Sequence, residues 1–352
     1  MTPQAAAAAG TTVPAPPRDD EELEERLSRP TPEVVEALAR LPGDVLVLGA
    51  AGKMGPSLAR MVRRARDAAG SSDRVIAVAR FSAPERESAL RAHGIETIRC
   101  DLADRRAVAA LPDAPILLFM AGQKFGTAAA PHAAWVANTV VPAVAAERWA
   151  GARFAVFSTG NVYPLSRVGG AGPAEDAPVG PVGEYAMSCL GRERVFEHFA
   201  ARDGTRAAII RLNYAVDLRY GVLVDVARKV WRGEPVDVTM AWANVIWQGD
   251  ANAWTLRALA LAAAPPAVLN VSGPALRIRD AAERLATLLG REARIVGAEA
   301  PDALLTDARR AAALFGPPAV PTETLLAWVA AWVRGGRSSG APTKFEVRDG
   351  RF

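Results

Sequence analysis

The chain has 352 residues; half of them are apolar, 23% are charged, and the formal net charge is +4. This length and composition indicate a soluble globular protein with a large core, arranged as one large domain or two closely joined ones. Lys and Arg are interspersed with Asp and Glu, and no basic stripe with interleaved aromatic residues occurs, which argues against nucleic acid as a partner.

The N-terminal stretch is rich in alanine and proline through Pro17, and the acidic run Asp19-Asp20-Glu21-Glu22 follows it. It lacks the basic and long apolar segments of a secretory signal, and no apolar stretch reaches the ~18 residues of a membrane span. Cys100 and Cys189 are too few for a disulfide framework or a cysteine-based zinc site, and we expect no metal. We therefore expect a cytoplasmic protein without a membrane partner, disordered over about its first 18 residues.

Strand and helix signals alternate after a leading helix, predicted from about Glu21 to Leu41. The predicted strands are Val45–Leu48, Val75–Ala79, Thr97–Arg99, Ile116–Met120, Phe154–Ser158 and, after a longer gap, Ala207–Arg211. The predicted helices between them are Ser57–Ala69, Pro84–Ala92, Arg105–Ala110, Ala133–Trp149 and Glu184–Ala201. Such alternation predicts βαβ units and an α/β fold of the Rossmann type, with a doubly wound parallel sheet.

The first strand ends in a turn with three glycines, Gly49-Ala50-Ala51-Gly52-Lys53-Met54-Gly55, and a helix follows. Glycines at this spacing let the backbone approach a pyrophosphate, whose charge is met by the free N–H groups of the helix N-terminus. A glycine triplet alone is weak evidence, because a tight turn needs glycine for steric reasons. With a strand before it and a helix after it, the turn predicts dinucleotide binding.

Beyond Arg211 the alternation becomes irregular, and Trp231, Trp242, Trp247 and Trp254 follow. This region predicts a smaller lobe over the carboxyl edge of the sheet, where ligands of open α/β sheets bind. The expected divisions are an N-terminus with its leading helix (1–40), an NAD(P)-binding Rossmann domain (41–211), a partly interleaved substrate-binding lobe (212–335) and a tail (336–352). The Gly/Ser-rich, then polar tail is expected to be either flexible or a short added strand.

Further landmarks follow the glycine turn in order along the chain. They are Asp101-Leu102, Met120-Ala121-Gly122, Asn138 in Trp135–Val140, Phe157-Ser158-Thr159-Gly160-Asn161-Val162-Tyr163, Tyr185-Ala186-Met187-Ser188, Arg211-Leu212-Asn213-Tyr214, Val245-Ile246-Trp247-Gln248-Gly249-Asp250 and Asn270-Val271-Ser272-Gly273-Pro274. The ordered set resembles the extended short-chain dehydrogenase/reductase superfamily, and within it the NAD-dependent epimerase/dehydratase family of sugar-modifying enzymes. The resemblance covers about Val45 to Val333.

The resemblance implies a role for each matching position. Thr159 would bind the substrate carbonyl or hydroxyl, Tyr185 would be the general acid/base, Asp101 would hold the adenine, and Gly122 would pass close to the cofactor ribose. The candidate cofactor residues are Gly49, Gly52, Lys53, Met54, Gly55, Arg80, Asp101, Leu102, Ala121, Gly122, Asn138 and Cys189. The candidate substrate residues are Gln123, Asn161, Asn213 and Tyr214.

One position departs from the family pattern Tyr-x-x-x-Lys, because the chain has Cys189 where the lysine would stand. A lysine favours tyrosinate by its charge and donates hydrogen bonds to the nicotinamide ribose, whereas a thiol has neither a fixed charge nor three donors. With an ordinary pKa of about 10, Tyr185 would stay protonated near neutral pH. Three explanations are open: Lys124 supplies the cation as a third catalytic residue, the substrate is acidic enough for a neutral tyrosine, or the protein binds its cofactor without redox chemistry.

The second strand ends in Ala79-Arg80, where an NAD-selective site would have an acidic residue to bond the ribose 2′-hydroxyl. Arg80 could clamp a 2′-phosphate, and Lys53 in the glycine turn could add a second charge. The sequence therefore favours NADP, with NAD possible because Arg80 could simply stack on the adenine.

These features together predict an NAD(P)-dependent oxidoreductase or epimerase that acts on a hydroxylated, sugar-like small molecule. Two alternatives are open: a cofactor-binding regulator with a degenerate site, and a lyase or dehydratase using transient oxidation, with the Glu175-Asp176 pair as a source of a base. The resemblance also implies a homodimer, formed through the helices predicted at Ala133–Trp149 and Glu184–Ala201.

Overall fold

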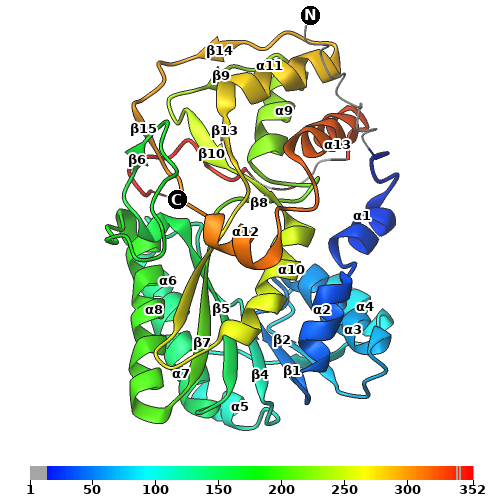
Figure 1. The fold of residues 1–352 in the computed structure, drawn as a ribbon, viewed down its shortest axis with the longest axis vertical. Helices are drawn as coiled ribbons and strands as arrows, with labels where there is room; N and C mark the ends of the chain where they lie inside the picture. The colour runs from blue at the N-terminus through cyan, green and yellow to red at the C-terminus, as the bar shows by residue number, and fades with distance from the viewer. Residues whose placement is uncertain (1–13, 338–339, 341, 352) are drawn as a thin grey trace, which may run out of the picture.

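The computed structural model describes residues 14–337, 340 and 342–351. At its centre is a seven-stranded parallel sheet in the order β12-β7-β5-β4-β1-β2-β3 (Figure 1). Its strands are β1 (Val45–Leu48), β2 (Val75–Ala79), β3 (Glu96–Arg99), β4 (Ile116–Phe119), β5 (Arg153–Thr159), β7 (Arg206–Leu212) and β12 (Ala267–Val271). The chain order changes direction at β1, so the sheet has its topological switch point between β1 and β4, where ligands of such sheets bind.

Helices cover both faces of the sheet, which is why its central strands are apolar on both sides. In β1, Val45 and Val47 pack into the core on one face, and Leu46 and Leu48 pack into the core on the other. The first face carries α2 (Pro32–Ala39), α3 (Gly55–Ala68), α4 (Pro84–Ala92) and α10 (Gln248–Ala258). The second face carries α5 (Arg105–Ala109), α7 (Val141–Arg148) and α8 (Gly183–Asp203).

The smaller lobe is built around three helices with a common apolar core, and it occupies the upper half of the view in Figure 1. These helices are α9 (Val222–Arg232), α11 (Ile278–Leu289) and α13 (Thr322–Arg334). The remaining elements are η2 (Gly160–Val162), β6 (Ser166–Arg167), β8 (Ala215–Val216), β9 (Val236–Asp237), β10 (Trp242–Asn244), β11 (Ile246–Trp247), η3 (Leu259–Leu261), β13 (Ala275–Arg277), β14 (Ile295–Val296), β15 (Asp302–Ala303) and α12 (Arg309–Phe315). No helix of the described chain has the length and apolarity needed to cross a membrane.

The Rossmann-type fold predicted from the sequence is confirmed, and all six predicted strands are present. The seventh strand, β12, was not predicted; it extends the sheet beside β7. The leading helix is two helices, α1 (Asp20–Leu27) and α2, because Pro30 and Pro32 interrupt the first and start the second. The predicted helix 133–149 is a composite of α6 (Pro131–Trp135), the π-helical turn η1 (Val136–Val140) and α7.

The two chain ends pack against the lobe where the structure describes them. The disorder predicted for the first ~18 residues falls mainly on residues 1–13, which lie outside the described residues. The Pro14 carbonyl accepts a hydrogen bond from Trp328 Nε1 of α13 at 2.8 Å, and Leu23 and Leu27 of α1 belong to the lobe core. No strand is found in the described part of the tail, but Phe345 is buried in the same core.

Candidate functional site

The glycine turn joins β1 to α3, and its three glycines serve different purposes. Gly49 has a φ of +87°, and a Cβ there would lie 2.6 Å from the Ala121 backbone nitrogen. A Cβ at Gly55 would collide with the carbonyl of Ala50. A Cβ at Gly52 would meet its nearest protein atom, the Gly49 oxygen, at 3.4 Å, so the fold itself tolerates a side chain there. Gly49 and Gly55 are therefore required by the turn, whereas Gly52 leaves open space above it.

The carboxyl ends of neighbouring parallel strands bring the candidate cofactor residues to one edge. Arg80 follows β2, Asp101-Leu102 follow β3 and Ala121-Gly122 follow β4, on either side of the turn after β1. The first turn of α3 has no side-chain cap, so its backbone N–H groups are available to an anion. Arg80 and Asp101 are exposed, and an Asp101 carboxylate oxygen accepts a hydrogen bond from the Ala103 nitrogen at 3.0 Å.

Thr159 and Tyr185 meet at the next position along this edge. Thr159 ends β5, and its hydroxyl donates to Asn161 Oδ1 at 3.0 Å and lies near enough to the Tyr185 side chain to influence its pKa. Cys189, one turn further along α8, is a second neighbour of Tyr185 that influences its pKa. Burial raises the pKa of Tyr185, and the nearby Cys189 raises it further, while the Thr159 hydroxyl and the charge of Arg192 lower it.

Lys124 lies in the loop after β4 and approaches the same group. Its Nζ lies 5.5 Å from the centroid of the Tyr185 ring and 5.8 Å from that of the Tyr214 ring. Burial lowers the pKa of Lys124 to about 8; the nearby charge of Lys53 also lowers it, and Cys189 raises it. The Lys124 side chain is therefore mostly protonated at neutral pH and loses its charge in mildly alkaline solution.

Asn138, in the π-helical turn η1, connects the loop after β4 to α8, and both of its amide hydrogens are used in doing so. Its Nδ2 donates to the Gln123 carbonyl and to Ser188 Oγ, each at 2.9 Å. Its Oδ1 accepts from the Gln123 nitrogen at 3.0 Å and from Arg192 Nη2 at 2.6 Å. π-Helical turns recur at functional sites. The sequence assigned Asn138 to cofactor binding, but the structure occupies its amide with protein groups.

Of the four candidate substrate residues, Asn161 and Tyr214 lie beside the catalytic candidates, and the side chains of Gln123 and Asn213 bond backbone carbonyls. Asn161 bonds Thr159, and Tyr214 lies beside Lys124 with a φ of +46°, a strained conformation for a non-glycine residue. Gln123 Nε2 donates to the Phe125 carbonyl at 3.3 Å. Asn213 is buried, with its Nδ2 donating to the Leu304 carbonyl at 3.4 Å.

A buried polar network behind β5 was not anticipated from the sequence. Glu193 of α8 pairs with Arg211 of β7 at 2.7 Å and accepts from Ser158 Oγ at 2.5 Å. Arg211 Nη1 also donates to the Tyr163 hydroxyl at 2.7 Å. The Glu175 carboxylate, considered above as a base, accepts from the Asn270 nitrogen at 3.0 Å and so helps to fix β12.

The C-terminal tail reaches the site, which sequence patterns did not indicate. Thr343 donates to Asp225 of α9 through its backbone nitrogen at 2.8 Å and its hydroxyl at 2.5 Å. Glu346 pairs with Lys229 at 2.5 Å and, after the larger effect of burial, contributes to the raised pKa of Tyr214. The backbone of residue 350 lies so close to Gly183, two residues before Tyr185, that a Cβ at Gly183 would collide with it.

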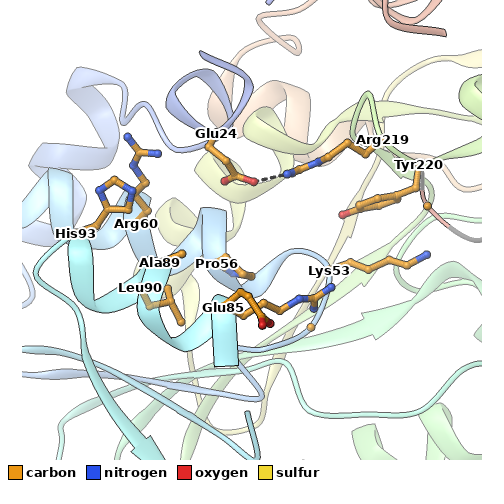
Figure 2. Close-up of a pocket in the computed structure, with 13 residues that line it drawn as sticks. Glu24, Lys53, Pro56, Arg60, Glu85, Ala89, Leu90, His93, Arg219 and Tyr220 are labelled. Carbon is orange, nitrogen blue, oxygen red and sulfur yellow. Dashed lines mark ion pairs between the residues drawn. The ribbon is translucent and has the colours of Figure 1, made fainter. Parts of the chain in front are cut away.

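A cavity of about 560 Å³ opens on the outer side of the glycine turn (Figure 2). Gly52 and Lys53 line it together with residues of α1, α3 and α4 and the Arg219-Tyr220 pair. Figure 2 shows Glu24 and Arg219 facing each other across its rim, and their side chains form an ion pair at 2.6 Å. Tyr185 and Thr159 do not line it, so this cavity is separate from the place where the chemically active groups meet.

The sequence predicted no metal site, and the described residues can be searched for one. Among those residues, no group of three or more His, Cys, Asp or Glu side chains is arranged to hold a metal ion. Cys100 and Cys189 are both buried and unpaired with each other.

A family model described as the NAD dependent epimerase/dehydratase family matches residues 45–230, just over half of the chain. The chain belongs to this family and is an enzyme of its NAD-dependent type, as the fold and the edge of the sheet indicate. No curated protein sequence matches the chain significantly.

Solved structures share the fold at low sequence identity. MoeE5 in complex with UDP-glucose and NAD is 24% identical, with a TM-score of 0.67 and coverage of 84% of this chain and all of MoeE5. UDP-glucose 4-epimerase from Thermotoga maritima, with UDP-glucose, is 19% identical, with a TM-score of 0.68 and coverage of 83% of this chain and 99% of that one. UDP-glucose 4-epimerase from Thermus thermophilus, in complex with NAD, has the same identity, TM-score and coverage.

Replacing Gly52 by Leu tests the glycine turn as a nucleotide site. Because a Cβ at this position meets no protein atom closer than 3.4 Å, we expect the variant to fold with a melting temperature near that of the wild type. The side chain would occupy the space above the helix N-terminus, so nucleotide affinity should fall by about a hundredfold or more, as expected when a buried contact worth about 3 kcal/mol is lost. Isothermal titration with NADH and NADPH measures it; unchanged affinity in the folded variant would contradict the assignment.

Proposed function

We propose that this protein is an epimerase or oxidoreductase that acts at an alcohol carbon of a hydroxylated, sugar-like small molecule. The observation that carries the proposal is the meeting of the Tyr185 hydroxyl with Thr159, close to Lys124, at the edge where the glycine turn and β4 also end. A hydride transfer at an alcohol carbon needs one group for the hydroxyl proton and another to orient the oxygen. Tyr185 and Thr159 fit these two tasks.

In this mechanism Thr159 turns its hydroxyl hydrogen from Asn161 to the substrate oxygen, and Tyr185, ionised to tyrosinate, takes the substrate's hydroxyl proton as the carbonyl forms. A nicotinamide cofactor, held at the glycine turn through its pyrophosphate, would accept the hydride and return it. In an epimerase, Tyr185 returns the proton when the hydride is delivered to the opposite face, so no net oxidation occurs. Lys124, by its positive charge, favours the tyrosinate form that this proton transfer requires, in place of the lysine missing at position 189.

The nucleotide that accompanies the purified protein tests this proposal and separates its two forms. Denaturing the protein should release NAD(H) or NADP(H) if the reaction is an internal oxidation and reduction, since the cofactor then stays bound. An oxidoreductase should instead be purified without nucleotide and should bind it reversibly. Conversion of UDP-glucose and other nucleotide sugars, followed by chromatography, then identifies the product. A protein that binds nucleotide but converts no sugar with it would favour the regulator, for which the absence of a lysine at position 189 is the supporting observation.

Replacing Lys124 by Met tests the substitute cation. We expect turnover to fall by about tenfold or more, and the acid limb of the pH profile to move upward, because Tyr185 ionises less readily without the nearby charge. The pKa of about 8 means that the Lys124 charge is lost as the pH rises through 8. Wild-type activity should therefore decline above about pH 8, and this alkaline limb should be absent from the variant.

Lys344→Met is the matched control, because Lys344 is an exposed lysine of the tail. It removes the same charge and should leave the rate and the pH profile as they are. If Lys124→Met also leaves both intact, Lys124 is not the cation, and a neutral Tyr185 acting with Thr159 becomes the better account.

The cofactor named in the family's description is NAD, and we propose that this chain accepts NADP in preference. The supporting observation is the end of β2, where Arg80 is exposed in the place of an acidic residue. A second guanidinium, that of Arg86, hydrogen-bonds the Ala51 carbonyl in the glycine turn. Two guanidinium groups beside the predicted ribose position attract a 2′-phosphate and do not repel it.

Arg80→Asp should weaken NADP binding much more than NAD binding, because a repulsive charge replaces an attractive one. We expect at least about a tenfold change in the ratio of the two dissociation constants, as the loss of one charge-assisted contact implies. Arg167→Asp, at an exposed position of β6, makes the same charge change elsewhere and should leave the ratio unaltered. Equal effects of Arg80→Asp on both nucleotides would show that Arg80 is a stacking or surface residue.

We also propose that two copies of the chain associate through the helices that precede and contain the site. The supporting observation is a set of large apolar side chains left exposed on three neighbouring helices, α6, η1 and α8. They are Trp135 (38% exposed), Val136 (42%), Val140 (44%) and Met187 (44%). Apolar groups gathered in this way are typical of a surface that a partner covers.

Light scattering over a dilution series should therefore give the mass of a dimer. Val140→Glu combined with Met187→Glu places charges on this surface and should shift the protein to monomer, because unpaired charges are costly in an interface core. Leu314→Glu, at another exposed apolar residue, is the control and should leave the dimer intact. A monomeric wild type across the series would refute the proposal.

A further inference from the structure

A second cation lies beneath the site, and the family resemblance did not point to it. Arg192 stands on α8 three residues after Cys189, and it is 5% exposed. Its Nη1 donates to the Phe157 carbonyl at 2.5 Å, and its Nη2 donates to Asn138 Oδ1 at 2.6 Å. Its Nε is buried without a hydrogen-bond partner among the described residues.

This guanidinium is not neutralised by a carboxylate within the described chain. The neighbouring Glu193 is turned to the other side of the helix, where it pairs with Arg211 at 2.7 Å. Arg192 instead contacts a carbonyl, an amide oxygen and the face of Phe119, whose ring centroid lies 5.7 Å from its Cζ. A buried charge without an ionic partner is costly, so a merely structural role would be served better by a neutral side chain.

The position of Arg192 relates it directly to the proposed reaction centre. A Cβ on Gly122 would collide with its Nη2, so the guanidinium packs against the backbone of the loop expected to pass close to the cofactor ribose. The Arg192 charge lowers the pKa of Tyr185 and that of Cys189, in each case against the larger opposing effect of burial. From one position on α8, Arg192 thus contacts the loop after β4 and acts on Tyr185.

We infer that Arg192 is a positioning residue that supplies the fixed positive charge lacking at position 189. The family's lysine would stand at position 189, whereas the cation of this chain stands three residues later on α8, as a guanidinium that hydrogen-bonds Phe157 and Asn138. The inference deepens the proposed function and rests on it, because it concerns the same nicotinamide and the same tyrosine. A guanidinium suits the task because its planar fork bonds two acceptors at once and keeps its proton throughout the working pH range.

The inference also explains why position 189 is not a lysine in this chain. Lys124 and Arg192 both act on the Cys189 thiol, since each lowers its pKa. A lysine ammonium at position 189 would stand between these two cations, with no carboxylate of the described chain paired to Arg192 to balance it. Cys189→Lys alone should therefore not restore the family's behaviour, whereas Cys189→Lys together with Arg192→Gln should.

The test compares the oxidised and reduced forms of the nucleotide, because the nicotinamide ring is positively charged in the first and neutral in the second. A cation beside the ring disfavours the oxidised form, so removing it should tighten binding of the oxidised form relative to the reduced form. We expect Arg192→Gln to lower the ratio Kd(oxidised)/Kd(reduced) at least about fivefold, as one charge at intermediate dielectric implies. Arg192→Lys keeps the charge and should stay within about twofold of the wild type on the same argument.

Titration calorimetry with NAD⁺ and NADH, or with the NADP pair, gives this ratio without any knowledge of the substrate. Loss of packing alone would weaken both forms alike and leave the ratio unchanged. Cys189→Lys in the Arg192→Gln background should raise the ratio back toward the wild-type value. In the wild-type background it should raise the ratio above that value and lower the melting temperature.

The outcomes separate this inference from the proposed function on which it rests. A ratio that Arg192→Gln does not move, in a protein that binds both forms, would overturn the role of Arg192 and leave the proposed function standing. A wild type that binds neither form would overturn both. If Arg192→Gln does not fold, Arg192→Met, which removes the charge and keeps an unbranched side chain, gives the same comparison: the ratio must fall, and an unchanged ratio refutes the electrostatic role.

Discussion

The amide of Asn138 is the contact on which the geometry of the site depends. It bonds the backbone of Gln123 in both directions and also joins Ser188 and Arg192 of α8. The loop after β4 and the helix that carries Tyr185 are thereby fixed relative to each other. Because four hydrogen bonds converge on one buried side chain, loss of the amide would leave several buried polar groups unpaired at once. The π-helical turn η1 contains Asn138, and such a turn changes the direction of a side chain inside an otherwise regular helix.

Burial acts in opposite directions on the titratable groups of the site. It raises the pKa of Tyr185 and lowers that of Lys124 to about 8, so both are pushed toward their neutral forms. Neutral groups cannot stabilise a developing charge as a fixed ion does. A guanidinium is exempt from this effect in practice, because it does not release its proton in proteins. Arg192 therefore keeps a positive charge at pH values where Lys124 loses its own, and the two cations are complementary.

The strands and the glycine turn could be predicted because their causes are local. Continuous apolar runs such as Val45–Leu48 indicate strands that are covered on both faces. A turn that places Gly49 at positive φ requires glycine, so it can be recognised in the sequence. Because βαβ units make the strands parallel, their carboxyl ends lie at one edge of the sheet, and Thr159, Tyr185 and Lys124 are expected there from the sequence alone. The family pattern also drew attention to position 189, where the expected cation is missing.

What could not be predicted depends on contacts between residues far apart in the chain. In the sequence, Arg192 has the pattern of an ordinary exposed helix residue. Its burial results from the packing of α8 against β5 and η1, which the sequence does not indicate. The contacts of Asn138 with Gln123, Ser188 and Arg192 could not be predicted either, because its motif indicates its position but not which way the amide points. The strand β12 is short and lies beyond the regular alternation, so its pairing with β7 has no local signal.

The C-terminal tail links the lobe to the chemistry in a way that residue spacing does not reveal. Thr343 and Glu346 are bound to α9 of the lobe, and the backbone of residue 350 lies against Gly183 at the start of α8. The tail thus connects the lobe to the helix that carries Tyr185, two residues further on. Phe345 anchors the connection in the lobe core, where it is 1% exposed. Any shift of the lobe relative to the sheet must therefore act on the N-terminus of α8 as well as on Tyr214. The position of the Tyr185 hydroxyl is consequently set from two sides, by Asn138 through the loop after β4 and by the tail through the lobe.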